Sequence, residues 1–238
     1  LKKLDLDTEI WETSGHPTIF AKNLRAGPER PTLLIYHHYD VQPVTPLNLW
    51  KSDPFQPEIR NGSMYARGAV DNKGQCFYTL TALKAFLELG EKYNFNLKLC
   101  IEGEEETGSH GLISILEKKK GDLQTDYILI IDTDMMGEDK PAVTLGVRGI
   151  TTLTIEWRVA SADLHSGTFG GFVLNPARAL ASTLHKCWDE KGRVAIPNFY
   201  DNIKTFSKDE LSAFDWEQNV QEMGKPFDIK AYSKENGF

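Results

Sequence analysis

Three short hydrophobic runs dominate the first half of the chain, at residues 33–36, 97–101 and 127–131. The first and third are nearly uninterrupted, whereas the second contains one charged residue, Lys98. Nearly continuous apolar runs of this length are typical of strands buried on both faces of a parallel sheet. We therefore predict three central strands at these positions.

The segments between these runs have the spacing of helices. Residues 72–89 carry apolar side chains at helical intervals and are followed by Gly90, a helix-stop residue. Residues 109–119 repeat this pattern more briefly, and the predicted helix ends in the run Lys118-Lys119-Lys120-Gly121. We interpret these lysines as a solvated helix end, where cations suit the negative end of the helix dipole.

Strand and helix patterns alternate, which predicts an α/β fold with a mostly parallel sheet flanked by helices. The pattern changes near residue 149. Residues 151–159 alternate apolar and polar side chains, as in a strand with one solvated face. A helix over 176–188 should follow, with Asn175 as its cap. We therefore expect a second domain, the start of an α+β unit.

Acidic and histidine residues follow each hydrophobic run. His38 and Asp40 come after the first run, residues 102–106 after the second and Asp132 after the third, while Asp71 precedes the first predicted helix. Because parallel strands end along one sheet edge, we expect these side chains to converge. Packed carboxylates repel one another unless a cation lies among them. One imidazole with several carboxylates suits a pair of Zn²⁺ ions, with Mn²⁺ or Co²⁺ as alternatives.

Each of these residues also has a structural interpretation when taken alone. His38 could be a hydrogen-bonded histidine at a strand end, and the acidic run 102–106 could be a solvated loop. Asp71 could be a helix N-cap, and Asp132 could be a turn residue. The residue pattern by itself leaves both a metal site and a set of structural residues open.

Composition mainly disfavours some classes of partner. The 238-residue chain has a net charge of −7 and a pI near 5.4, which disfavours nucleic acid and anionic membranes, since both need a basic face. No apolar run approaches the roughly 18 residues of a membrane span. The three cysteines are far apart and form no C-x-x-C pair. We therefore expect free thiols and a cytoplasmic location.

A series of motifs occurs at these same places and covers most of the chain: HHYDVQP at 37–43, WKSDPF at 50–55, YARGAVDNKG at 65–74, EGEEETGS at 102–109, IDTDMM at 131–136, LGVRG at 145–149 and DLHSGTFGG at 163–171. Their combination resembles the co-catalytic zinc metallopeptidases and amidohydrolases, which include carnosinase-like dipeptidases, acetylornithine deacetylase and succinyl-diaminopimelate desuccinylase. The resemblance is greatest to the dipeptidase branch. It implies the amino-terminal part of a catalytic domain over 1–148 and an incomplete lid or dimerisation domain over 149–238.

The resemblance implies the metal ligands one by one. His38, Asp71 and Asp132 would hold one metal, and Asp71 would bridge to a second metal bound by Glu106. Asp134 competes with Asp132 for the same role. In relatives the peptide bond after the bridging aspartate is cis. Relatives supply a further histidine to the second metal from a segment with no match here, so this chain should bind one metal well and the second poorly.

The resemblance also implies the catalytic residues. Glu105 would act as general base toward a metal-activated water that attacks an amide bond in a dipeptide or short peptide. Asp40 would orient His38. His165 would reach the partner subunit's site and contact the oxyanion or the substrate.

Other functions remain open from the sequence. An N-acyl amino acid deacylase of the deacetylase or desuccinylase type would use the same metals, and a non-catalytic relative would keep only the fold. The expected partners are a small peptide or an N-acyl amino acid, and a second copy through the second domain when the protein is full length. Neither nucleic acid nor a membrane is expected to bind. The polar end of the chain suggests a fragment, for which catalysis in isolation is doubtful.

Overall fold

The chain divides into two units, Leu1–Val147 and Arg148–Phe238, and each is described by itself. The computed structural model describes residues 1–90, 93–133, 135, 142–144, 146–147, 149–212 and 227–230. Asp134 and parts of the motifs at 131–136 and 145–149 therefore lie outside the described residues. The assignment of the two units to a catalytic domain and a lid domain stays a prediction.

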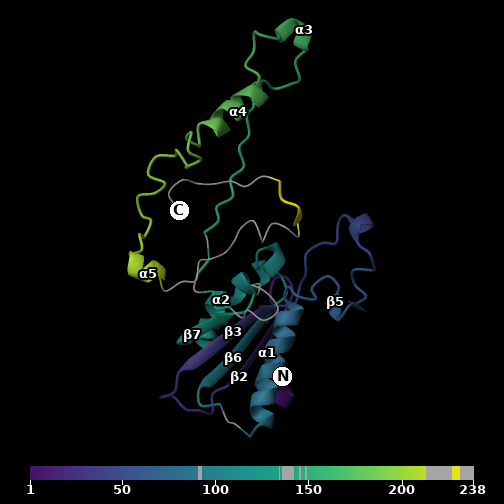
Figure 1. The fold of residues 1–238 in the computed structure, drawn as a ribbon, viewed down its shortest axis with the longest axis vertical. Helices are drawn as coiled ribbons and strands as arrows, with labels where there is room; N and C mark the ends of the chain where they lie inside the picture. The colour runs from purple at the N-terminus through teal and green to yellow at the C-terminus, as the bar shows by residue number, and fades with distance from the viewer. Residues whose placement is uncertain are drawn as a thin grey trace. The chain divides into compact units, whose positions relative to one another are not determined.

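A five-stranded sheet forms the centre of the first unit (Figure 1). Its strands lie in the order β1 (Asp7–Trp11), β2 (Thr18–Asn23), β6 (Asn96–Glu102), β3 (Thr32–His38) and β7 (Tyr127–Ile130). Strand β3 pairs in parallel with β6 and β7, whereas β1 with β2 and β2 with β6 are antiparallel pairs. The three predicted strands and the α/β class are confirmed. The sheet is mixed because β1 and β2, which the pattern did not predict, extend it with antiparallel pairs.

Helices α1 (Lys73–Glu88) and α2 (His110–Leu123) cover opposite faces of this sheet. Leucines of α1 pack on the cluster that contains Ala21, and Ile115 of α2 packs with Phe20. Phe20 and Ala21 are successive residues of β2, so their side chains point to opposite faces. Both predicted helices are confirmed, and both faces of β2 are buried.

The predicted end of the second helix is wrong. Helix α2 continues through Gly121 to Leu123. Leu123 is partly buried against the cluster of Trp11 and Phe20, and this apolar contact offsets the roughly 1 kcal/mol that a helical glycine costs. Lys98 of β6 then donates from Nζ to the Gln124 carbonyl at 2.6 Å, which satisfies a carbonyl just beyond the helix.

The burial predicted for the third strand is also wrong. Strand β7 forms where expected, but its residues are exposed, from 41% for Leu129 to 65% for Tyr127. Among the described residues β7 pairs with β3 alone. An apolar run indicates that both faces of a strand are suited to burial. Whether they are buried depends on the elements that pack against them.

Short elements complete the first unit. The hairpin of β4 (Glu58–Arg60) and β5 (Ser63–Tyr65) turns at Asn61 and Gly62, both with positive φ, as an Asn-Gly hairpin turn requires. Three single turns of 3₁₀ helix are η1 (Lys2–Leu4), η2 (Leu47–Leu49) and η3 (Glu105–Thr107). Turn η3 places two acids beside the end of β6.

The second unit contains α3 (Ser166–Phe169), α4 (Pro176–His185) and α5 (Lys208–Ser212). The predicted cap of α4 is confirmed, because Asn175 Oδ1 accepts from the Arg178 N–H at 3.1 Å. The strand predicted at 151–159 is absent from the described structure. A period-two pattern specifies two faces of a strand, but a strand also needs a hydrogen-bonding partner, and the described residues supply none there.

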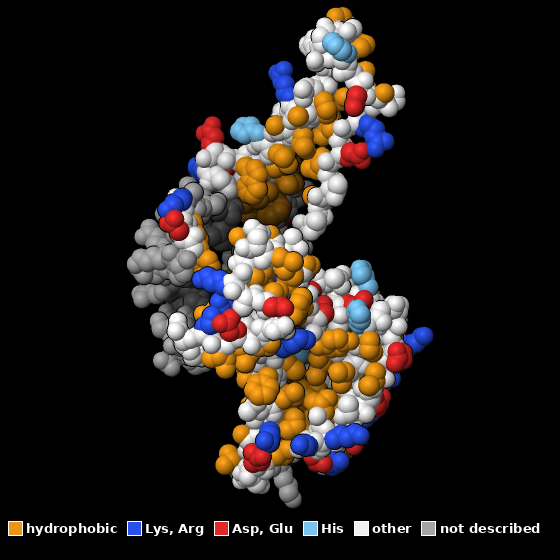
Figure 2. All heavy atoms as spheres, turned by 90° about the vertical axis from the view of Figure 1, so that its right-hand side faces the viewer, with side chains coloured by type: hydrophobic (Ala, Val, Ile, Leu, Met, Phe, Trp, Pro, Cys, Tyr) orange, Lys and Arg blue, Asp and Glu red, His pale blue; other side chains and the backbone are white. Residues whose placement is uncertain are grey.

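Many apolar side chains of the described residues are exposed, and Figure 2 shows hydrophobic side chains on the visible surface of each unit. Helix α1 contributes Phe77, 72% exposed, and Tyr78, 50% exposed. No helix within the described ranges has both the length and the apolar character needed to cross a membrane.

We predict that iodoacetamide modifies Cys100 only after unfolding. Its side chain is 2% exposed, and burial raises the pKa of the thiol to about 12, so the reactive thiolate is scarce at mildly alkaline pH. Mass spectrometry with and without denaturant measures the modification of each cysteine. Cys187, which is partly exposed, is the internal control. Equal labelling of Cys100 and Cys187 in the native protein would contradict the prediction.

Candidate metal centre

The site is built around the imidazole of His38, the last residue of β3. Its side chain is fully buried. Atom Nδ1 lies 3.2 Å from both the Oδ1 and the backbone carbonyl of Asp40. Both groups accept, so Nδ1 carries the proton and Nε2 presents a lone pair. Nε2 has no hydrogen-bond partner among the described residues.

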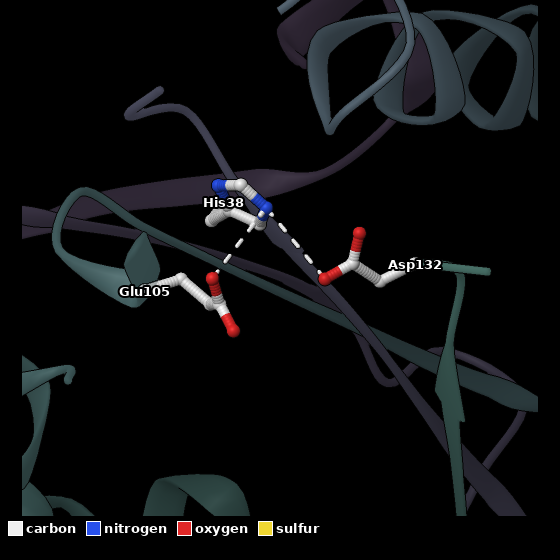
Figure 3. Close-up of side chains that lie close together, drawn as sticks. All are labelled: His38, Glu105 and Asp132. Carbon is white, nitrogen blue, oxygen red and sulfur yellow. Dashed lines mark ion pairs between the residues drawn. The ribbon is translucent and has the colours of Figure 1, made fainter. Parts of the chain in front are cut away.

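Carboxylates from three other segments face this nitrogen. Asp71 Oδ1 lies 2.9 Å from His38 Nε2 and precedes α1. Asp132 Oδ2, just beyond β7, lies at 3.6 Å, and Glu105 Oε2 of η3 at 3.9 Å. Figure 3 shows the last two carboxylates directed toward the same ring nitrogen, with Glu105 to the left and Asp132 to the right of it. The convergence expected at the carboxyl ends of the parallel strands is therefore present.

Two groups of potential ligand atoms each fit within 4.8 Å. One contains His38, Glu105 and Asp132, and the other contains His38, Asp71 and Glu106. This grouping differs from the expected trio of His38, Asp71 and Asp132, because Glu105 takes the place of Asp71 beside Asp132. All four carboxylates nevertheless share the His38 imidazole as a group member.

The carboxylates control the electrostatics of the centre. Burial alone would lower the pKa of His38, but the charges of Asp132, Asp40, Glu105 and Asp71 outweigh it and raise the pKa. The pKa of Glu105 is also raised, first by burial and then by the neighbouring carboxylates, which the charge on His38 partly offsets. Both pKa shifts arise because several negative charges lie close together, and a bound cation would relieve their repulsion.

Asp40 ties the acidic turn to the imidazole. Its carboxylate accepts from the backbone N–H of Glu105 at 3.2 Å and of Glu106 at 3.0 Å, besides its contact with His38. The Glu106 carboxylate accepts from Gln42 Nε2 at 2.6 Å. The loop after β3 therefore orients both the histidine and the two acids of η3. Gln42 was not identified as a site residue from the sequence, although it lies within the HYDVQP motif.

Asn72 is a second residue that the sequence did not single out. It is fully buried, and its amide contacts His37 and Asp132. The peptide bond between Asp71 and Asn72 is cis, as the family resemblance implied. The residue at the N-cap of α1 is Asn72, not Asp71, so the capping interpretation of Asp71 is wrong. The position of Asn72 beside Asp71 in DNKG was the available signal.

The donor set fits a divalent metal. A buried nitrogen lone pair surrounded by carboxylate oxygens has no donor to satisfy it, so only a cation relieves the arrangement. A proton is one such cation, which the raised pKa of His38 reflects. One imidazole with several carboxylates is a typical ligand set for Zn²⁺ and its divalent substitutes.

His165 lies in the second unit, where it caps α3 by accepting from the Gly167 N–H at 3.1 Å through Nδ1. His165 and the His38 centre belong to different units, so a contact between them stays a prediction. The ligand and catalytic roles of the other site residues are likewise predictions.

Comparison with known proteins relates this arrangement to a family. Residues 34–233 match peptidase family M20/M25/M40. The chain is 38% identical over 191 residues to the Cys-Gly metallodipeptidase dug1 of Schizosaccharomyces pombe, covering 79% of this chain and 40% of that protein. It is 35% identical over 200 residues to the Beta-Ala-His dipeptidase of Mus musculus, covering 83% and 41%. The chain thus spans about two fifths of the length of these relatives.

Solved structures of similar enzymes share the fold of this chain. A metallo-carboxypeptidase of family M20 from Sulfolobus solfataricus superposes with a TM-score of 0.81 at 34% identity, over 98% of this chain and 53% of that one. Human carnosine dipeptidase 1 superposes with a TM-score of 0.68 at 28% identity, over 98% and 51%. The fold is therefore shared with enzymes about twice as long.

We predict that Asp40→Asn weakens Zn²⁺ binding by about 10- to 100-fold, the usual effect of removing a partner that orients a ligand. The amide would lose the charge that holds the proton on His38 Nδ1. Competition with a chromophoric chelator measures the affinity. Asp53→Asn is the matched control, because the Asp53 carboxylate also accepts a backbone N–H, from Phe55, whereas the Asp40 carboxylate also contacts His38. Equal affinities of the two variants would refute the role of Asp40.

Proposed function

Because the chain belongs to peptidase family M20/M25/M40, we propose that it carries most of the metal site of a metal-dependent dipeptidase. The observation that supports this most is the buried, unpartnered Nε2 of His38 facing carboxylates from three segments. Such crowding is unfavourable without a cation. The relatives support the reaction class, since several are called metallodipeptidases or dipeptidases.

The proposed metal ligands are His38, Asp71 and Asp132 at one site, with Asp71 shared and Glu106 at the other. Two Zn²⁺ ions, with Mn²⁺ or Co²⁺ as alternatives, suit this set of one imidazole and carboxylates. The second site lacks a histidine in the described chain. The whole protein would need to supply it from a segment that the matched region does not contain.

When bound, the metals supply a Lewis acid and lower the pKa of water. Glu105 is the proposed base, and it would accept the proton of the attacking water at a carboxylate oxygen. Its side chain is 38% exposed, so water reaches it, and its raised pKa makes it a better proton acceptor than an ordinary carboxylate. Glu106 is less suited, because Gln42 holds one of its oxygens.

A cavity of about 780 Å³ adjoins the centre, and Asp71 and Glu106 lie in its wall together with Trp50, Tyr65 and Arg67. This volume is typical of sites for small ligands. It has room for a dipeptide, so the cavity supports a small substrate beside the proposed metals. The dimer through the second unit, the cytoplasmic location and the contact of His165 with the substrate remain proposals about the whole protein.

We predict that Glu105→Gln lowers turnover by about 10²- to 10⁴-fold, the usual contribution of a general base, while metal content stays unchanged. The amide is isosteric but cannot accept a proton. Turnover of the longest natural polypeptide that contains this chain and its metal content by mass spectrometry are the two measurements. Glu104→Gln is the control, because Glu104 belongs to the same acidic run but accepts from the Gly111 N–H. An unchanged rate in Glu105→Gln would rule out its role as base.

The same polypeptide also tests the substrate class. We expect hydrolysis of at least one member of a dipeptide panel, abolished by a chelator and restored by Zn²⁺, Mn²⁺ or Co²⁺. Acetylated and succinylated amino acids form the comparison panel. Activity on acylated amino acids alone would replace the dipeptidase with a deacylase. Metal binding without hydrolysis of either panel would favour a non-catalytic relative.

A further inference from the structure

A buried amide lies directly behind the proposed metal site. The Asn72 side chain is fully buried and follows the cis peptide bond after Asp71. Asn72 occupies the N-cap position of α1, but its side chain makes no capping hydrogen bond within the described structure. Its amide is instead directed to the ends of the two strands that flank it, β3 and β7.

All hydrogen-bonding capacity of this amide is used. Asn72 Nδ2 donates to the Ile131 carbonyl and to Asp132 Oδ1, both at 2.8 Å. Asn72 Oδ1 accepts from the His38 backbone N–H at 3.4 Å and lies 2.8 Å from His37 Nδ1. An amide has two donor hydrogens and one acceptor oxygen with two lone pairs, so all four positions are occupied.

These partners fix both the amide orientation and the His37 tautomer. The Ile131 carbonyl and the Asp132 carboxylate only accept, so the NH₂ group must face them. The oxygen then faces His37, which must carry its proton on Nδ1. The His37 side chain is completely buried, so this donor is confined to the amide. A chain of donors therefore runs from His37 through Asn72 to Asp132.

Only one oxygen of Asp132 takes part in this series of hydrogen bonds. Asp132 Oδ1 accepts from the amide, while Oδ2 lies 3.6 Å from His38 Nε2. We propose that Asn72, oriented by His37, is a positioning pair that fixes the Asp132 carboxylate with Oδ2 presented to the metal. This inference rests on the proposed function, because it concerns how a proposed ligand is held.

The chemistry of the amide explains its place in this centre. A side chain that fixes Asp132 must donate a hydrogen bond to it, yet another cation would compete with the metal and another carboxylate would repel Asp132. A neutral amide donates without adding charge. An ionised aspartate at position 72 could accept from His37 but could not donate to Asp132.

The test measures metal binding instead of catalysis. We expect Asn72→Ala to lower the affinity for Co²⁺ by about 10- to 100-fold, the usual effect of losing a partner of a ligand, and to change the visible absorption spectrum of bound Co²⁺. His37→Leu, which removes only the donor to the amide, should lower the affinity by less, in the same direction. Asn96→Ala is the matched control. Asn96 is also buried, and its Nδ2 donates to two carbonyls, of Gly27 and Arg30, at the opposite end of β6.

Thermal melting of the metal-free proteins separates loss of fold from loss of positioning. The proposal holds if Asn72→Ala loses affinity while Asn96→Ala melts at least as early but binds Co²⁺ like the wild type. Equal Co²⁺ affinities and spectra in Asn72→Ala and the wild type overturn it. If Asn72→Ala does not fold, His37→Leu decides, and an affinity within about twofold of the wild type overturns the proposal. A wild-type protein that binds no Co²⁺ or Zn²⁺ overturns the proposed function itself, and this inference with it.

Discussion

The crowding of carboxylates around one buried imidazole is the constraint on which this structure depends. Asp71, Glu105 and Asp132 come from three segments far apart in the sequence, yet each places an oxygen within 4 Å of His38 Nε2. Like charges in such a space disfavour the folded state unless a cation joins them. The centre therefore makes sense as a site that is completed by metal, and the surrounding structure keeps the acids from separating.

Two sets of neutral or backbone donors hold the acids in place. Asp40 accepts from the N–H groups of Glu105 and Glu106, which fixes the acidic turn to the loop after β3. On the other side, Asn72 donates to Asp132 beyond β7. Neither arrangement adds positive charge, so both leave the demand for a cation unmet. The hydrogen-bond donors thus orient the carboxylates, and neutralising their charge is left to a bound cation.

Two segments of the described structure lack the neighbours that their sequence patterns predict. The apolar strand β7 is exposed although its sequence is typical of a buried strand. The alternating segment 151–159 forms no strand within the described structure. In both places the sequence encodes a contact surface for which the described residues supply no partner.

The sequence by itself determined the local elements and the types of residue at the site. Apolar runs and helical spacing identified β3, β6, β7 and both helices, and the position of acids after the strands indicated that they would meet at one edge. Local patterns suffice for this because the strand period, the caps and the direction of parallel strands are properties of short segments. The family motifs then predicted that His38 is a ligand.

Only the tertiary structure decided which atoms face one another. The pairing of Asp40 with two backbone N–H groups, the amide of Asn72 between His37 and Asp132, and the orphaned Nε2 of His38 join residues up to 94 positions apart. The amino-terminal strands and the exposure of β7 were also not readable from the sequence. Hydrogen bonds and burial depend on neighbours brought together by folding, and a pattern along one chain specifies a need for such neighbours without specifying which they are.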